Sequence, residues 1–398
     1  SSLKDGLGGP VWGTGKDVVD ILSSRDIPFL KDFTRNAALT KELGTYYARY
    51  DEKKKTYVGM LTTVGADNIV HHSLNHTSTN TSRLSSSNPN MQNIPRKDKS
   101  TVKAMFTSRF GEDGTMVEID YSQLEVVVQG LLSMDDNLIA DLIARIDFHC
   151  KRVSAKFGIS YEEALHRCKS EDFEQENPEE AEMWSDRRTG VKEFSFQRAY
   201  GAGKDAISAA TGLPVEDVEQ LIASEDAMYP GVGLFNDAVA REVEHSAEPF
   251  RDPQRGFRMF RRGYWQAPTG TLYSWRSWDA PAFLKARGIT DSFSPPELKN
   301  YPVQGTGGEL VQLALGILVR TYYANNNWDS KAFLVNTVHD CVWIDCHKSV
   351  ASEVTKLSVK VMENIPMYLK RFFNIDCPVP FPVEAELGPT MMDLKHFH

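Results

Sequence analysis

The sequence predicts an α+β fold, because one stretch has a helical side-chain pattern and two others have the pattern of buried strands. Between residues 188 and 200, four cationic or aromatic side chains recur at every fourth position, which places them about one turn apart on one helix face. Val117–Ile119 is a short apolar strand that ends at an acidic motif. Leu334–Asp345 is apolar around a central His-Asp pair, which is typical of a buried strand–turn–strand.

The segments that precede the acidic motif predict a loop, a helix and a second loop. Residues 1–16 hold five glycines and a proline, so we expect a loop there. Residues 17–47 carry apolar side chains at helical spacing and predict a helix. Residues 73–95 are rich in Ser, Thr and Asn and predict a polar segment dominated by loops.

Three further segments follow the motif. Leu124–Leu132 predicts a helix. Glu171–Asp186 holds eight acidic residues and a proline, so we expect a solvated surface loop whose end favours the start of the next helix through the helix dipole. Arg251–Trp265 interleaves arginines with aromatic residues. That pattern fits either a single nucleic-acid strand stacked on the rings or a solvated hairpin.

Composition describes an ordinary soluble chain and does not reveal a function. The 398 residues are enough for two or three subdomains, and no apolar stretch approaches the length of a membrane span. The net charge of −9 does not indicate nucleic-acid binding, so any such site must gather its Lys and Arg in a cleft. Five cysteines without CxxC pairing and an N-terminus without signal-peptide features indicate free thiols in an intracellular protein.

The helical ladder consists of Arg188, Lys192, Phe196 and Tyr200. One helix face therefore offers two cations, a flat ring and a phenol, in that order. Cations suit the phosphates of a nucleoside triphosphate, and an aromatic ring suits its base or sugar. The alternative is an amphipathic helix with solvated basic residues and aromatic core contacts. The carboxylate motifs that flank the ladder in sequence argue against this alternative.

The ladder, RxxxKxxxFxxxYG, is one of six blocks that occur in the same order in family A (DNA polymerase I-like) DNA polymerases. From about residue 35 to its C-terminus the chain therefore resembles that family, and the segments 251–276 and 291–301 look more like phage-encoded members. The other blocks are TSRLSSSNPNMQNIPR at 81–96, DYSQLEV at 120–126, YPGV at 229–232, YPVQGTGGEL at 301–310 and VHD at 338–340.

The resemblance implies a right-hand polymerase with an antiparallel palm sheet, helical fingers and a partial thumb. We expect residues 1–76 to form the partial thumb and residues 77–150 the first part of the palm, which contains the acidic motif. Residues 151–299 would form the fingers with the nucleotide-binding helix, and residues 300–398 the second part of the palm.

The implied reaction is template-directed addition of dNTPs to a primer 3′-hydroxyl, with release of pyrophosphate. Two divalent cations serve this chemistry, one at the attacking oxygen and one at the leaving group. Mg²⁺ prefers oxygen ligands, so we expect Asp120 and Asp340 to bind two Mg²⁺ ions, for which Mn²⁺ can substitute; the resemblance implies the backbone carbonyl of Tyr121 as a further ligand. The expected partners are primer–template DNA and dNTPs, with the protein a monomer in the cytoplasm, or in the host cytoplasm if phage-encoded.

The resemblance also assigns the remaining side chains. Glu125 would block a ribose 2′-hydroxyl and bond to Tyr200, and Lys192 would be catalytic as well as nucleotide-binding. Besides Lys192, the expected nucleotide-binding residues are Tyr121, Gln123, Glu125, His149, Arg188, Phe196 and Tyr200. The expected DNA-binding residues are Arg83, Gln92, Asn93, Asn300, Gln304 and His339.

Three positions depart from the family pattern. Val127 replaces an arginine, Ser82 replaces the usual glycine before Arg83, and Cys341 replaces the third carboxylate of the HDE motif. That carboxylate is generally not an essential metal ligand, so activity is still expected. Two rivals remain: a single-subunit RNA polymerase, against which Glu125 argues, and a catalytically inactive primer–template-binding module, against which the retained aspartates and cations argue.

We predict that Phe196→Tyr strongly relaxes discrimination against dideoxynucleotides while barely changing the use of dNTPs. A phenol at this position can occupy the hydrogen-bonding space that a missing 3′-hydroxyl leaves, whereas a phenyl ring cannot. The test is the ddNTP:dNTP incorporation ratio of both proteins, with the melting temperature as a control for a purely core role. An unchanged ratio would remove Phe196 from the nucleotide site.

Overall fold

A computed structural model of the chain describes residues 15, 18, 19, 22, 27–96, 99–199, 202–253 and 256–397. The chain divides into two compact units. The first unit comprises residues 1–74 and 86–103, and the second comprises residues 75–85 and 104–398. The predicted subdomain boundaries at residues 76, 150 and 299 remain a prediction.

The first unit is built around one helix and one hairpin. Helix α2 spans Pro28–Thr45, with a proline at its first position, where the missing N–H costs nothing. It falls within the helix predicted for 17–47. A hairpin follows, in which β1 (Arg49–Asp51) pairs antiparallel with β2 (Thr56–Val58). The hydroxyl of Ser100 donates to Glu42 on α2 at 2.7 Å, which ties the later segment of this unit to the helix.

Residues 73–95 are largely irregular, as predicted from their polar composition. Their regular structure consists of two short strands. The short elements of this part of the chain are η1 (Met60–Thr63), β3 (Ser73–Asn75), β4 (Ser85–Ser87), η2 (Val102–Met105) and η3 (Gly111–Asp113).

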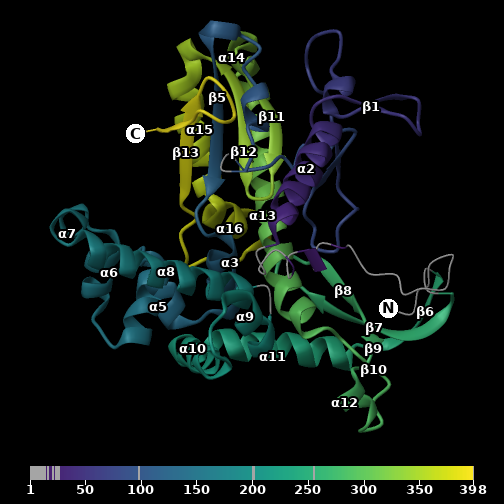
Figure 1. The fold of residues 1–398 in the computed structure, drawn as a ribbon, viewed down its shortest axis with the longest axis vertical. Helices are drawn as coiled ribbons and strands as arrows, with labels where there is room; N and C mark the ends of the chain where they lie inside the picture. Colours follow the sequence, from purple (N-terminus) through teal and green to yellow (C-terminus); the bar gives the residue numbers. More distant parts are fainter. Residues whose placement is uncertain are drawn as a thin grey trace. The chain divides into compact units, whose positions relative to one another are not determined.

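The second unit contains an antiparallel five-stranded sheet in the order β11-β12-β5-β13-β14. Figure 1 shows its long strands side by side in the upper part of the view. The predicted strand at Val117–Ile119 is the middle of a longer strand, and the predicted strand–turn–strand is confirmed. The strands are β5 (Gly114–Tyr121), β11 (Ala332–Val338), β12 (Cys341–His347), β13 (Val383–Gly388) and β14 (Lys395–His396).

The two faces of this sheet differ in chemistry. Alternate residues of β5, such as Val117 and Ile119, are fully buried in the main apolar core. Helix α15 (Lys348–Glu363) packs against this face and contacts all four of the longer strands. The intervening residues of β5, Glu118 and Asp120, point to the opposite face. That face also carries a small apolar cluster with Met116, Cys341 and Trp343, so both faces help to anchor the strands that present the carboxylates.

Most of the remaining second unit is helical, and its helices α5 to α8 gather at the lower left of Figure 1. Helix α3 confirms the helix predicted after the acidic motif. The helices before the next sheet are α3 (Leu124–Ser133), α4 (Asp136–Ile143), α5 (Phe148–Phe157), α6 (Tyr161–Lys169), α7 (Glu171–Glu176), α8 (Pro178–Ala199), α9 (Lys204–Thr211), α10 (Val215–Met228) and α11 (Pro230–His245).

The prediction of a surface loop at Glu171–Asp186 is wrong, because the segment forms α7 and the first part of α8. Ser170 caps α7 by accepting the N–H of Phe173, and Pro178 occupies the first position of α8. Acidic side chains in the first turns of both helices favour the helix dipoles. Trp184 is buried in a small apolar core, so the solvated acidic residues form only one side of these helices.

The Arg251–Trp265 segment forms a hairpin within a three-stranded sheet, β6-β7-β8. Trp265 is buried against α11, and Arg258 and Arg261 form ion pairs with Asp279 and Asp291. Because both arginines are paired with aspartates of the protein, the hairpin interpretation is favoured over contact with a nucleic-acid strand for Arg258 and Arg261. The elements here and beyond are β6 (Glu248–Asp252), β7 (Arg258–Gln266), β8 (Leu272–Arg276), β9 (Trp278–Asp279), α12 (Ala282–Lys285), β10 (Asp291–Ser292), α13 (Pro295–Ala324), α14 (Asn326–Ser330) and α16 (Ile365–Phe373).

In the part of the chain that the structure describes, no helix is both long enough and apolar enough to cross a membrane.

We predict that Gly305→Ala destabilises the protein by about 1–3 kcal/mol, the usual cost of overpacking. A Cβ at Gly305 on α13 would lie 2.3 Å from the ring of Tyr273, which cannot easily yield because its hydroxyl donates to Glu309. Gly316→Ala on the same helix is the matched control, since nothing lies within 4 Å of its Cβ. Urea unfolding of both variants provides the measurement. Equal stabilities would contradict the close packing at Gly305.

Candidate active site

The sheet brings the two predicted metal-binding aspartates together. Asp120 lies near the end of β5, and Asp340 lies in the tight turn that joins β11 to β12. The antiparallel register places Cys341, the residue after Asp340, directly opposite Asp120. The backbone N–H of Tyr121 donates to the carbonyl of Asp340 at 3.4 Å. Two motifs far apart in sequence therefore meet at one edge of the acidic face.

The carboxylates at this place repel one another. Burial of the carboxyl, together with the negative charges of Asp340, Glu118 and Glu384, raises the pKa of Asp120 to about 7. The residue still opens to solvent on one side. Burial also raises the pKa of Asp340, an effect that Arg83 partly offsets. Such a cluster favours a bound cation, which would stabilise the charged form of each carboxylate.

These aspartates fit a divalent cation that takes only part of its ligands from the protein. Among the described residues, no three or more His, Cys, Asp or Glu side chains form a group that could hold a metal ion. Mg²⁺ commonly binds through one or two carboxylates and completes its shell with water and substrate phosphates. The donor set of Asp120 and Asp340 therefore suits Mg²⁺ bound together with a phosphorylated substrate.

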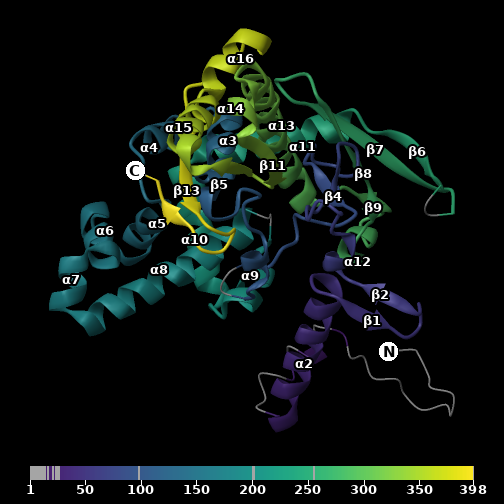
Figure 2. The same cartoon turned by 90° about the horizontal axis from the view of Figure 1, so that it is seen from above.

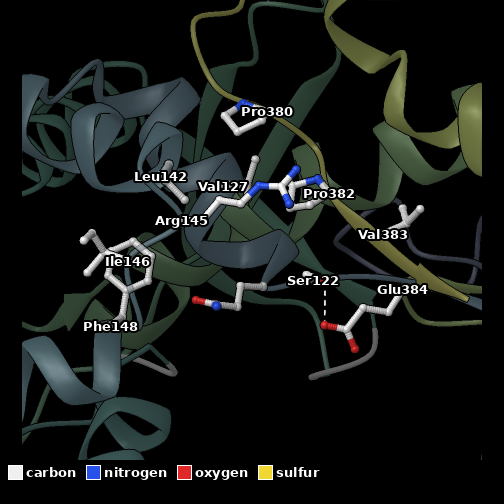
Figure 3. Close-up of a pocket in the computed structure, with 11 residues that line it drawn as sticks. Ser122, Val127, Leu142, Arg145, Ile146, Phe148, Pro380, Pro382, Val383 and Glu384 are labelled. Atoms are coloured by element: carbon white, nitrogen blue, oxygen red, sulfur yellow. Dashed lines mark hydrogen bonds between the residues drawn. The ribbon is translucent and has the colours of Figure 1, made fainter. Parts of the chain in front are cut away.

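Cys341 adds no charge beside these aspartates. Its side chain is buried, and burial together with the charges of Glu118 and Asp120 raises the pKa of the thiol well above its usual value. The carboxylate directly opposite Asp120 on the other neighbouring strand is Glu384. It accepts a hydrogen bond from the Ser122 hydroxyl at 3.3 Å, drawn as a dashed line in Figure 3.

A cavity of about 230 Å³ lies beside Ser122 and Glu384. Val127, where the family has an arginine, lines it, and Arg145 enters the same cavity from the end of α4. In Figure 3 the Arg145 side chain extends toward Pro382. Arg145 carries no local sequence signal, because solvent-facing arginines follow helices at many positions. A cation thus remains in the cavity that Val127 lines.

Glu125 and Arg83, predicted for the sugar and for the primer, lie within ion-pair distance of each other. Nη2 of Arg83 is 3.1 Å from Oε1 of Glu125, in the first turn of α3. The preceding residue, Ser82, has a φ of 52°, a left-handed conformation that glycine adopts without strain. The side-chain amide of Gln312 donates to the Ser82 carbonyl and helps to hold this turn. Tyr200, the predicted partner of Glu125, lies outside the described residues.

The ladder helix is α8, the long helix at the left of Figure 2. Lys192 is exposed on it, whereas Arg188 is half-buried and its Nη2 lies 2.8 Å from a carboxylate oxygen of Asp147. Phe196 belongs to α8, but its side chain lies outside the described part. Of the four ladder side chains, the structure therefore describes the two cations.

His149 lies in the first turn of α5, next to these cations. Burial and the positive charges of Arg152, Arg188 and Lys192 lower its pKa to about 4. The imidazole is therefore neutral near pH 7 and can act as a hydrogen-bond donor or acceptor. Arg188 and Lys192 thus place positive charge beside the His149 imidazole.

The remaining predicted residues lie on three different segments. Asn300 and Gln304 are half-buried on α13, and His339 is exposed, with a φ of 56°, directly before Asp340. Gln92 and Asn93 belong to the first unit, and Gln123 precedes α3 as its N-cap residue, with a φ of 56°. Contacts of these residues with DNA or nucleotide remain a prediction.

Comparisons with known proteins agree with the predicted family. A family model described as DNA polymerase family A matches residues 19–393. The DNA polymerase of Bacillus phage SP01 is 27% identical over 338 residues, which cover 83% of this chain and 32% of the phage protein. DNA polymerase I, thermostable, of Thermus thermophilus is 27% identical over 346 residues, 86% of this chain and 35% of that protein. The chain thus spans about a third of the length of these relatives.

The fold also matches a solved structure. The POL domain of Pol1 from M. smegmatis, in complex with DNA primer-template and dNTP, aligns with 98% of this chain and 57% of that chain at a TM-score of 0.65. Sequence identity is 19%, so this likeness concerns the fold alone. It supports the predicted right-hand architecture, with an antiparallel palm sheet and helical fingers.

We predict that Asp120→Asn stabilises the metal-free protein at pH 8 but not near pH 4. The folded-state pKa of about 7 exceeds the unfolded value, so between these values the native state holds a proton that the unfolded state lacks. The resulting stability is present at low pH and is lost as the pH rises through 7. After solvent screening we expect a gain of about 1 kcal/mol at pH 8. Thermal melts in chelator across this range provide the test, and a pH-independent difference would contradict the raised pKa.

Proposed function

The chain belongs to DNA polymerase family A, and on that premise we propose that it adds dNTPs to a primer 3′-hydroxyl under the direction of a template. The observation that carries the proposal is the meeting of Asp120 and Asp340 at the end of β5, within a chain that the family model matches over residues 19–393. A DNA polymerase of a Bacillus phage is among its relatives, which supports the expectation that the chain resembles phage-encoded members of the family.

Asp120, Asp340 and the backbone carbonyl of Tyr121 would hold two Mg²⁺ ions, or Mn²⁺ in their place. When bound, the ions supply positive charge at the attacking and leaving oxygens. The aspartates would orient this charge because Asp120 lies on β5 and Asp340 in the turn between β11 and β12, and these strands are anchored by the main apolar core. Pyrophosphate is the expected leaving group.

The cations of α8 would bind the triphosphate. Lys192 is exposed on this helix and would also act in catalysis, by stabilising charge that develops on the phosphates. Arg188 and the neutral imidazole of His149 would contact the same phosphates. Gln123 would contact the nucleotide from the start of α3, and Phe196 would lie beside its sugar.

Glu125 would select the deoxyribose by excluding a 2′-hydroxyl, with Tyr200 as its partner. An added hydroxyl would clash and leave buried polar groups unpaired. An RNA polymerase must admit the hydroxyl, so a carboxylate at this position favours DNA synthesis over the RNA polymerase alternative. The exposed cation at Lys192 and the paired aspartates likewise favour an active enzyme over an inactive binding module.

Primer–template DNA would be held near the paired aspartates. Hydrogen-bond acceptors in the minor groove are shared by all base pairs, so contacts there test the shape of a pair and not its sequence. We propose that the protein acts as a monomer inside the cell, with thumb, palm and fingers divided as expected from the sequence. The proposed DNA contacts are Arg83, Gln92, Asn93, Asn300, Gln304 and His339.

Primer extension by Asp120→Ala and Asp340→Ala tests the proposal. Each variant is expected to lose extension while it retains primer–template binding, because each removes one of two metal-binding carboxylates. The parent protein is assayed with dNTPs, with rNTPs and without divalent metal. Extension with rNTPs at the dNTP rate would favour the RNA polymerase alternative. A parent protein that binds primer–template but never extends it would favour the inactive module, and near-normal extension by either variant would overturn the metal assignment.

A further inference from the structure

One carboxylate lies where three helices of the nucleotide-binding part meet. Asp147 is the N-cap residue of α5, and its Oδ1 accepts the backbone N–H groups of His149 at 3.0 Å and Cys150 at 2.9 Å. Its Oδ2 lies 2.8 Å from Nη2 of Arg188 on α8 and 3.3 Å from Nζ of Lys169 at the end of α6. A single side chain therefore caps one helix and holds a cation of another.

Two buried polar atoms beside this carboxylate have no hydrogen-bond partner in the described part of the chain. They are Nδ1 of His149 and Nε of Arg188. Buried polar atoms are nearly always paired, because an unpaired atom loses its hydration without compensation. An oxygen-rich anion such as a triphosphate would supply an acceptor to each side chain.

Asp147 holds the guanidinium of Arg188 in place but leaves a net positive charge around it. Asp147 is shared between Arg188 and Lys169. Lys192, one turn further along α8, is exposed and has no carboxylate partner among the described side chains. Asp147 is thus the one carboxylate paired among three cations, Arg188, Lys169 and Lys192, in the described part of the chain. The remaining positive charge can attract an anion. An arginine held by a carboxylate also loses less conformational entropy when it binds a ligand.

We propose that Asp147 is a positioning residue of the nucleotide site, which orients Arg188 directly and His149 through the N-terminus of α5. This inference rests on the proposed function, because it assigns a triphosphate as the ligand of both side chains. Asp147 does not touch the nucleotide itself. It acts by keeping the guanidinium and the imidazole aimed at the same phosphates before the nucleotide arrives.

Two substitutions separate the cap from the charge. Asp147→Asn keeps a good N-cap but presents an uncharged amide to Arg188. Asp147→Glu keeps the charge but is a poor cap. We expect Asp147→Asn to weaken dNTP binding about tenfold, with the maximal incorporation rate within about threefold of the parent, since a tenfold loss is typical of one charge-assisted contact. Asp147→Glu should bind dNTP more tightly than Asp147→Asn, yet melt at a lower temperature.

The measurement is single-turnover incorporation by the full chain at varied dNTP, which separates apparent dNTP affinity from maximal rate. Asp135→Asn is the matched control, because Asp135 caps α4 and its second oxygen accepts a backbone N–H, from Gly231, in place of a cation. It should leave dNTP affinity unchanged. Asp147→Ser, also a good cap without charge, is made in parallel and should behave as Asp147→Asn does.

A double-mutant cycle tests whether Asp147 acts through Arg188. In an Arg188→Ala background, Asp147→Asn should cause at most about a twofold further loss of dNTP affinity. Unchanged dNTP affinity in both Asp147→Asn and Asp147→Ser would overturn the inference, as would full additivity with Arg188→Ala. The wild-type protein in the same assay reports on the proposed function separately: if it does not incorporate dNTPs, the proposed function fails, whereas an active wild type with unaffected variants refutes only the role of Asp147.

Discussion

The antiparallel pairing of β5 with β12 is the constraint on which the site depends. It places Asp120 opposite Cys341, so that the turn carrying Asp340 lies beside the end of β5. The pairing holds because the opposite face of these strands, with Val117 and Ile119, is buried in the main core. A one-residue slip of β5 would turn Glu118 and Asp120 toward the main core and Val117 and Ile119 away from it, so the hydrophobic effect fixes the positions of these carboxylates.

The clustering of carboxylates around Asp120 destabilises the folded state but prepares it to bind a cation. Asp120 has Asp340, Glu118 and Glu384 as acidic neighbours, and in the absence of a cation their mutual repulsion opposes folding. The buried side of the sheet offsets this cost. The helices α5 and α8 show the corresponding effect for positive charge. Arg188 and Lys192 lower the pKa of His149, so the imidazole stays neutral beside two cations. An acidic surface and a cationic surface, each unfavourable alone, are suited to a substrate that carries phosphates together with metal ions.

The sequence was sufficient for the parts of the fold that depend on local pattern. The apolar run around His339 and Asp340 predicted two strands and a turn, and the helix after the acidic motif followed from its spacing. The acidic stretch that begins at Glu171 was misjudged, because its helices depend on the cap at Ser170 and on the burial of Trp184, whose partners are distant in sequence. Asp147 and Arg145 were missed for a similar reason: an N-cap aspartate and an exposed arginine look alike at many positions until the fold supplies their neighbours.

The packing of helix α8 in two small cores affects how its side chains can move. Its residues Trp184 and Val191 pack with α5 and α6 in a small core that is separate from the core under the palm sheet, and Phe194 packs in another with α9 and α10. The start of α5 is attached to both cores, because Phe148, directly after Asp147, packs in the main core against Tyr229, whereas Cys150 and Val153 pack in the small core. Asp147 therefore lies where the two cores meet, while its partner Arg188 lies on α8. A displacement of α8 relative to the main core would act directly on this ion pair, so the position of the guanidinium depends on how the two cores are held together.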